Sequence, residues 1–180
     1  MCMKHRRARG LTFTDLMATL AIFTLLLGAA VPNLQYFFLK QQADAHAHLI
    51  LRHMQKTREI AVLSGRNMTI CGLNEENICS PSNFRTIAIF QDANENRKVD
   101  EDEIIESQLE LDFEGRVLLR AGAMRFIRYY HHGGANPMGG FVLCPQSGDA
   151  TLVRRISTQM AGRPYLARSG TEAELLASCG

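Results

Sequence analysis

The sequence lacks the short motifs that mark the common catalytic sites. It contains no G-x-S-x-G, no H-E-x-x-H and no glycine-rich phosphate loop ahead of a helix. These patterns position a serine nucleophile, a zinc ion with its base, and a bound phosphate, respectively. Their absence argues against a serine hydrolase, a zinc peptidase or a nucleotide-driven enzyme. We therefore expect a protein that is not an enzyme.

The chain has no net positive charge beyond its first residues. The 180 residues carry a formal net charge of +2. Four basic residues lie ahead of Gly10, namely Lys4, Arg6, Arg7 and Arg9. Taking these four away leaves a net charge of −2 for the rest of the chain. This balance excludes a generally basic nucleic-acid-binding domain.

The cysteines do not have the spacing of a zinc site. Cys2 lies in the basic tail, and the other four are Cys71, Cys79, Cys144 and Cys179, with no C-x-x-C pair among them. An even number beyond an apolar segment indicates disulfides in an oxidising compartment, with reduced core cysteines as the alternative. Three pairings are open. We favour Cys71–Cys79, which closes a short loop, with Cys144–Cys179, which fastens the C-terminus.

A long apolar run, Gly10–Pro32, follows the basic tail and contains one acid, Asp15. From Leu11 to Val31 it is long enough to cross a bilayer, which takes roughly 20 residues. Lys and Arg lie only on its N-terminal side, which places that end in the cytoplasm. A carboxylate in such a helix costs about 2.5–3.5 kcal/mol on insertion scales, so Asp15 should have a partner and a purpose.

Three interpretations of this run compete. It is a secretory signal cut after Gly28-Ala29-Ala30, an uncleaved anchor, or a prepilin leader cut between Gly10 and Leu11. A glycine separates the tail from the apolar run, Thr12 follows, an acid stands fifth from Leu11, and Pro32 stands twenty-second. These details favour the prepilin leader.

The segment resembles the N-terminus of type IV pilins and type II secretion pseudopilins. Their pattern is a glycine, an apolar residue, Thr or Ser, and a fifth-position Glu, where this chain has Leu11 and Asp15. The resemblance implies cleavage after Gly10 by a prepilin peptidase and N-methylation of Leu11. It also implies that Asp15 neutralises the Leu11 amine of a neighbouring subunit, a buried pair that fixes register more than it stabilises.

The segment Asn33–Ser64 is predicted to continue as an amphipathic helix that ends at Gly65. Its apolar stripe consists of Ala43, Ala47, Ile50, Met54 and Ala61, and we expect His46, His48 and His53 to be exposed to solvent. Strands are expected at Met68–Cys71, Thr86–Phe90, Ile104–Leu111, Arg116–Leu119, Arg125–Tyr130, Phe141–Cys144, Leu152–Ser157 and Tyr165–Ala167. A helix followed by strands predicts an α+β fold in which the long N-terminal helix packs on an antiparallel β-sheet domain.

The body of the chain narrows the resemblance. The stretches REIAVLSGRNMTIC, IAIFQDANENRKVDEDEII, FVLCP and RRISTQMAGRPY follow one another in order and are similar to the GspH/FimT family of minor pseudopilins and minor pilins. The resemblance implies a pilin-like fold with a leader (1–10), a membrane-spanning half-helix (11–32), an amphipathic half-helix (33–65) and a periplasmic β-rich domain (66–180). It implies a subunit of a short filament of a type II secretion system or type IV pilus, held in the bacterial inner membrane by a single span. The partners would be other pilins or pseudopilins, the prepilin peptidase and membrane lipid.

An acidic stretch could carry a metal. Its members Asp92, Asn94, Asn96, Asp100 and Glu103 match positions one, three, five, nine and twelve of an EF-hand calcium loop. Arg97 stands at position six, where the EF-hand has its turn glycine, and the flanks are predicted strands instead of helices. The alternatives are a strand–loop–strand calcium site and a polar hairpin turn; apart from calcium we expect no cofactor.

Arginines near the C-terminus could hold DNA. The set is Arg154, Arg155, Arg163 and Arg168, with Tyr165 among them. Arginines interleaved with an aromatic can bind a phosphate backbone while a base stacks on the ring. Some members of the resembled family bind DNA through Gly-Arg-x-Arg, and this chain has Gly-Arg-Pro-Tyr at positions 162–165. The alternative function is therefore a minor pilin that captures DNA, and the alternative for the residues is a surface that balances the acidic stretch.

Overall fold

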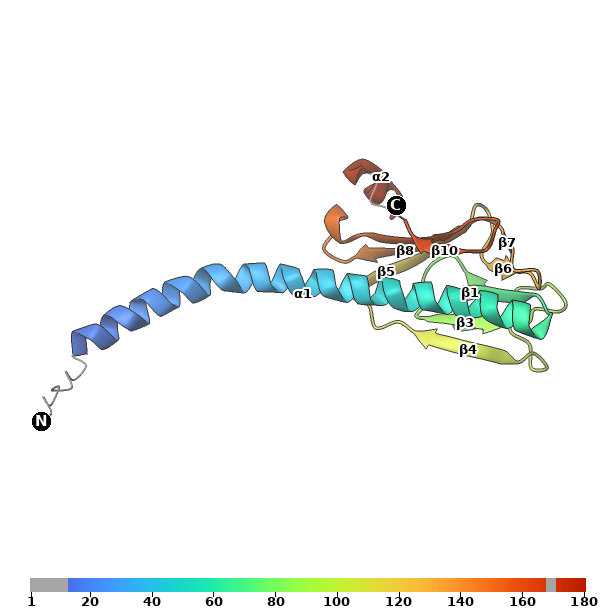
Figure 1. The fold of residues 1–180 in the computed structure, drawn as a ribbon, viewed down its shortest axis with the longest axis horizontal. Coiled ribbons are helices and arrows are strands. Elements are labelled where there is room, and N and C mark those ends of the chain that lie inside the picture. The colour runs from blue at the N-terminus through green and yellow to red at the C-terminus, as the bar shows by residue number, and fades with distance from the viewer. Residues whose placement is uncertain (1–12, 168–170) are drawn as a thin grey trace, which may run out of the picture. The chain divides into compact units, whose positions relative to one another are not determined.

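The computed structural model describes residues 13–167 and 171–180 (Figure 1). The chain divides into two compact units, one ending at Leu39 and one running from Lys40 to Gly180. In the first unit the described residues are helical. Helix α1, Phe13–Ser64, begins there and ends in the second unit. Taken over the described residues, neither helix combines the length and the hydropathy that a bilayer-crossing helix requires. The span predicted for 11–31 begins outside these residues and stays a prediction.

The second half of α1 forms where the amphipathic pattern predicted it. The whole predicted stripe, Ala43, Ala47, Ile50, Met54 and Ala61, is buried. The helix ends at Ser64, and Gly65 follows with a φ of +67°. This left-handed conformation is the usual C-terminal stop of a helix and is easiest for a residue without a Cβ. The sequence therefore predicts both the buried face and the end of α1.

The predicted antiparallel fold is confirmed, and the strands are divided between two sheets. The first sheet has the order β4-β3-β1-β6-β7, with β2 also paired to β1, and the second has the order β10-β9-β8-β5. The strands are β1 Met68–Leu73, β2 Cys79–Ser80, β3 Thr86–Phe90, β4 Ile105–Glu110, β5 Gly115–Arg120, β6 Ile127–Tyr129, β7 Ala135–Asn136, β8 Gly139–Pro145, β9 Arg154–Thr158 and β10 Pro164–Leu166. The chain visits the second sheet at β5, returns to the first for β6 and β7, and then completes the second. Strand patterns alone do not reveal such a crossover.

Several element bounds differ from the prediction. Residues Ala150–Leu152 form the short 3-10 helix η1, because Asp149 caps its N-terminus by accepting from the Thr151 amide, so the strand β9 begins at Arg154. The two-residue strands β2 and β7 and helix α2, Glu172–Ala177, were not predicted. Such short pieces carry too few residues for a period to be visible.

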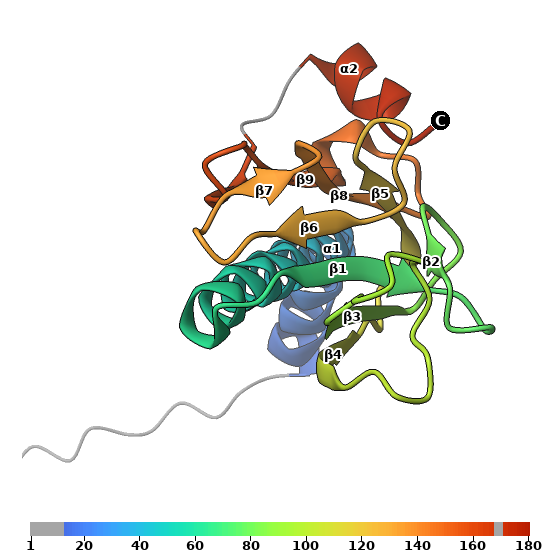
Figure 2. The same ribbon diagram turned by 90° about the vertical axis from the view of Figure 1, so that its right-hand side faces the viewer.

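The core lies between α1 and the inner faces of both sheets. The buried face of α1 belongs to one apolar cluster with Ile70, Ile127, Phe141 and Ile156, which come from both sheets. In β8, side chains alternate between this cluster and a second one: Phe141 and Leu143 point inward, while Val142 and Cys144 join Leu175 of α2. On the second sheet, α1 covers the inner face and α2 covers the part of the outer face that β5 and β8 provide (Figure 2).

Both disulfides that we favoured are present. Cys71 is bonded to Cys79, eight residues apart, and Cys144 is bonded to Cys179, thirty-five residues apart. The first joins β1 to β2, which are paired strands of the first sheet. The second fastens the end of α2 to the outer side of β8. Each sheet thus has one covalent tie.

Candidate functional site

The predicted processing site falls at the edge of what the structure describes. Gly10 and Leu11 lie outside the described residues. Asp15 is in the first turn of α1 and is exposed. From Phe13 to Leu39 large apolar side chains are also exposed, with Phe13 73% and Leu25 75% accessible. Asp15 is the one charged residue in this stretch.

The acidic loop between β3 and β4 is closed by its own side chains. The side-chain amides of Asn94 and Asn96 both donate to Asp100 Oδ2, at 2.8 and 2.6 Å. These hydrogen bonds lower the pKa of the Asp100 carboxyl. Glu103 accepts from the Ala93 amide at 3.0 Å and from the Asp100 amide at 3.4 Å. The structure therefore brings four of the five predicted calcium residues into one network.

Asp92, the fifth, lies at the buried base of the loop. Its side chain is 0% exposed, and its Oδ2 is 3.3 Å from the Arg128 guanidinium, which is 12% exposed. The same oxygen accepts from the Arg97 amide at 3.3 Å, while Oδ1 is buried without a hydrogen-bond partner. Arg128 also contacts Glu95 at 2.5 Å. Among the described residues, no three His, Cys, Asp or Glu side chains form a cluster that could hold a metal ion as the loop stands.

The loop covers the outer face of the first sheet, and it is held there by Arg97 together with Phe126 and Arg128, which the sequence alone did not single out. Arg97 and Arg128 both lie over the Phe126 ring, at 5.3 and 5.5 Å from its centroid. The Cys79 amide donates to the Arg97 carbonyl at 2.8 Å, and the Val99 amide donates to Asn77 at 2.9 Å. Figure 2 shows this loop beside β1 and β2. Only the spacing of Phe126 and Arg128, two apart in the predicted strand Arg125–Tyr130, could have indicated the pair, although β6 itself begins at Ile127.

The predicted arginine set is divided by the structure. Arg154 is 2.5 Å from Asp44 of α1 and donates to the carbonyls of Thr151 and Val153, so its charge is engaged within the domain. Arg168 lies outside the described residues. Arg163 and Tyr165 are exposed, and Arg155 is half-buried.

The register of β9 and β10 brings part of this set together. Tyr165 pairs with Ser157. The Ala167 amide donates to the Arg155 carbonyl at 2.8 Å. Residues two apart share a face of a strand, so Tyr165 and Arg155 lie on the same face of the second sheet. Arg154 points the other way, toward α1.

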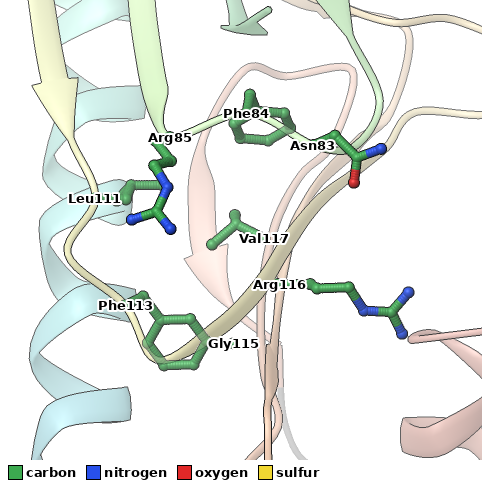
Figure 3. Close-up of a pocket in the computed structure, with 8 residues that line it drawn as sticks. All are labelled: Asn83, Phe84, Arg85, Leu111, Phe113, Gly115, Arg116 and Val117. Carbon is green, nitrogen blue, oxygen red and sulfur yellow. The ribbon is translucent and has the colours of Figure 1, made fainter.

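A cavity of about 240 Å³ lies between the start of β3 and β5 (Figure 3). Phe84, Leu111, Phe113 and Val117 provide apolar walls, and Arg85 provides a charged one. The Arg116 side chain points away in Figure 3 and donates to the Cys179 carbonyl at 3.0 Å. The cavity thus presents one cation over an apolar floor, without a pair of groups suited to acid–base chemistry.

The histidines of α1 correct an expectation. His48 is exposed as predicted, but His53 is buried, at 7% exposure, and His46 is half-buried with its ring 5.6 Å from that of Phe113. Burial and the nearby Lys56 lower the pKa of His53 to about 4. A neutral histidine can belong to a helix face that covers a sheet. Because the histidine ring is polar, a search for apolar residues at helical spacing does not include His53 in the buried face.

The sequence model of the family described as type II transport protein GspH matches residues 46–162, more than half of the chain. No curated protein matches the sequence at a significant level.

Two solved structures share the fold. The type IV minor pilin FimU of Pseudomonas aeruginosa, in one crystal form, is 16% identical with a TM-score of 0.52, over 74% of this chain and 93% of that one. The minor pseudopilin EpsH of the type 2 secretion system of Vibrio cholerae is 16% identical with a TM-score of 0.50, over 70% of this chain and 96% of that one. At these identities the likeness concerns the fold.

Proposed function

Because the chain belongs to the GspH family of type II transport proteins, we propose that it is a minor subunit of a filament, either a pseudopilin of a type II secretion system or a minor type IV pilin. Its role would be structural: it would help to build a short filament that drives secretion or pilus action. The relatives of known fold, one a minor pilin and one a minor pseudopilin, support both versions.

The observation that carries this proposal is the exposed apolar half of α1. Burying a large apolar side chain is worth about 1.5–3 kcal/mol. A stretch from Phe13 to Leu39 that exposes such side chains along its length therefore favours burial in lipid or against like helices. We propose that it anchors the subunit in the bacterial inner membrane, with the N-terminus cytoplasmic and the domain periplasmic, and then packs in the filament. Two disulfides suit a periplasmic domain.

The N-terminal chemistry belongs to the same proposal. A prepilin peptidase would cut between Gly10 and Leu11, and the new amine of Leu11 would be N-methylated and remain cationic. Asp15 would neutralise the amine of a neighbouring subunit, which sets the axial register of the two helices. The charge of Asp15 in an otherwise uncharged stretch supports this role.

Substitutions at two positions separate processing from assembly. Gly10→Val should leave the leader on the protein, as the intact mass would show. Asp15→Ala should be cleaved normally but enter sheared filaments at least about tenfold less than the parent protein, since one unpaired buried charge costs several kcal/mol. Asp15→Glu keeps the charge and is the matched control. Normal incorporation of Asp15→Ala would refute the pairing role.

A minor pilin that captures DNA is the second candidate, and the shared face of Tyr165 and Arg155 with the exposed Arg163 favours it. A gel shift of the full chain in detergent tests it, because binding through phosphate contacts weakens as salt rises. Arg163→Ala should weaken binding, whereas Arg154→Ala, which removes an engaged arginine, should not. No shift at low salt would exclude this candidate.

A further inference from the structure

We propose that the loop between β3 and β4 is a calcium site. The ligands would be the side-chain oxygens of Asp92, Asn94, Asn96, Asp100 and Glu103, with the backbone carbonyl of Lys98. These residues occupy positions one, three, five, nine, twelve and seven of the EF-hand series of oxygen ligands. The loop is flanked by strands β3 and β4, whereas an EF-hand loop is flanked by two helices. This proposal does not rest on the filament function.

The first observation in the structure is an oxygen atom that has no partner. Asp92 Oδ1 is buried and accepts no hydrogen bond, although the side chain around it is 0% exposed. Its sister atom Oδ2 is already engaged by Arg128 and by the Arg97 amide. An unsatisfied buried carboxylate oxygen is costly. Oδ2 accepts from the Arg97 amide, which belongs to the loop, and Oδ1 is bonded to the same carbon as Oδ2. Oδ1 therefore also lies at the base of this loop. In an EF-hand, the residue at position one supplies a ligand from this place.

The backbone of the loop has the shape that such a site needs. Two residues of this loop other than glycine have a positive φ, namely Glu95 at +60° and Arg97 at +64°. They stand at positions four and six. Position six is the sharp turn at which the EF-hand uses glycine. The loop therefore makes that turn although its sequence lacks the glycine.

The remaining carboxylates lie close by but do not meet. Asp100 is held by the amides of Asn94 and Asn96, and Glu103 by the amides of Ala93 and Asp100. Three carboxylates cannot gather at one point without a cation, because like charges destabilise one another. A divalent cation removes that obstacle. Rotation of each asparagine amide would then replace its Nδ2 with Oδ1 toward the centre of the loop.

The donor set indicates which cation fits. Carboxylate, amide and carbonyl oxygens are hard ligands that suit calcium, and no sulfur or imidazole belongs to the set. Six or seven oxygens from a flexible loop suit calcium better than magnesium, which demands a strict octahedron and keeps its waters. From Asp92 to Glu103 the loop has six acids against Arg97 and Lys98. A bound calcium ion would neutralise part of that excess.

The site would join three segments of the domain. Asp92 is paired with Arg128 of β6, and the Arg97 carbonyl accepts from Cys79 of β2. Calcium binding to the loop would therefore fasten the cover of the first sheet to the strands beneath it. We expect slower hydrogen exchange in the loop and in β2 when calcium is bound, with α2 unchanged.

The experiment is a titration of the metal-stripped full chain in detergent with calcium chloride, followed by calorimetry and by melting temperature. We expect one site with a Kd of about 10⁻⁴–10⁻³ M, the range of extracellular calcium modules, and a rise in melting temperature. Asp100→Asn and Glu103→Gln each remove a ligand charge and should weaken binding at least about tenfold. Arg97→Gly supplies the turn glycine and should strengthen it.

The matched controls are Asp102→Asn and Glu101→Gln, which make the same chemical changes in the same loop at positions that do not ligate. Both should bind calcium as the parent chain does. The proposal is overturned if the parent chain shows no heat of binding and no change in melting temperature up to about 10 mM calcium, tenfold above the expected range. It is also overturned if the controls weaken as much as the ligand variants, or if magnesium acts equally, since diffuse attraction would then explain the effect.

Discussion

The outer faces of the two sheets are covered by different kinds of segment, a polar loop on the first sheet and a short helix on the second. The first sheet is covered by the polar loop after β3, which is held by the Asp92–Arg128 ion pair and by two guanidinium groups over the ring of Phe126. The outer face of the second sheet is covered at β5 and β8 by α2, through Leu175 and the disulfide from Cys144 to Cys179. The loop packs Val99 against the core and is tied to β2 by a backbone hydrogen bond, and the buried ion pair adds to these contacts. A helix of six residues is too short to be stable alone, so a covalent bond holds it.

The largest expected effect comes from breaking the charge that holds the loop. Arg128→Met leaves the buried Asp92 without its partner, which should lower the free energy of unfolding by about 3–5 kcal/mol. Guanidinium unfolding of the full chain in detergent with a chelator measures it. Adding Asp92→Asn to the same chain should restore part of the loss, because the unpaired charge is then removed. A cost below about 1 kcal/mol for Arg128→Met would contradict the comparison.

Removing the covalent tie of the second sheet should cost slightly less. Cys144→Ala with Cys179→Ala opens a loop of thirty-five residues, and chain entropy predicts a loss of about 4 kcal/mol at most. Hydrogen exchange should show loss of protection in α2 while the loop on the first sheet keeps its protection. If the loop on the first sheet lost as much protection as α2, the disulfide would not stabilise α2 independently of that loop.

A pH titration addresses the inner face that the sheets share with α1. The pKa of His53 is lowered from 6.5 to about 4, so the unfolded chain binds more protons between these values. Stability should therefore be full above about pH 6.5 and fall as the pH decreases toward 4, by about 2 kcal/mol once partial solvent screening is allowed for. His53→Leu should flatten this part of the unfolding profile. An unchanged slope in that variant would assign the loss to other groups.

The smallest effect is expected from the ion pair of the second sheet. Arg154 and Asp44 have side chains 18% and 40% exposed, so water and salt screen their attraction. Arg154→Met should cost no more than about 1 kcal/mol, mainly through its bonds to two backbone carbonyls. Comparison with Arg128→Met in the same assay tests whether the more buried ion pair contributes more to the free energy of unfolding. Similar losses would show that it does not.

The sequence predicts the parts of this fold that repeat a pattern. The stripe of α1 follows a helical period, Gly65 is a known end signal, and Thr86–Phe90 is a short apolar run typical of a buried strand; the structure has all three. The division into two sheets could not be predicted, because pairing such as that of β1 with β6 joins residues far apart in the chain.

The candidate sites were also only partly predictable from the sequence. The spacing of the calcium loop is visible in the sequence, but Arg128, which balances Asp92, is thirty-six residues away and belongs to no motif. Arg154 looked equivalent to its neighbours until its pairing with Asp44 was known. Side chains that act through long-range contacts carry no local signal.

The alternation in β8 limits how this domain can change over evolutionary time. Phe141 and Leu143 complete one core while Val142 and Cys144 complete the other. Loss or gain of one residue there would exchange the two sets and misplace the disulfide at once. A lineage can therefore substitute residues in β8 but cannot shorten or lengthen it. Changes in length are tolerated more easily in the connections between strands, where no register is shifted.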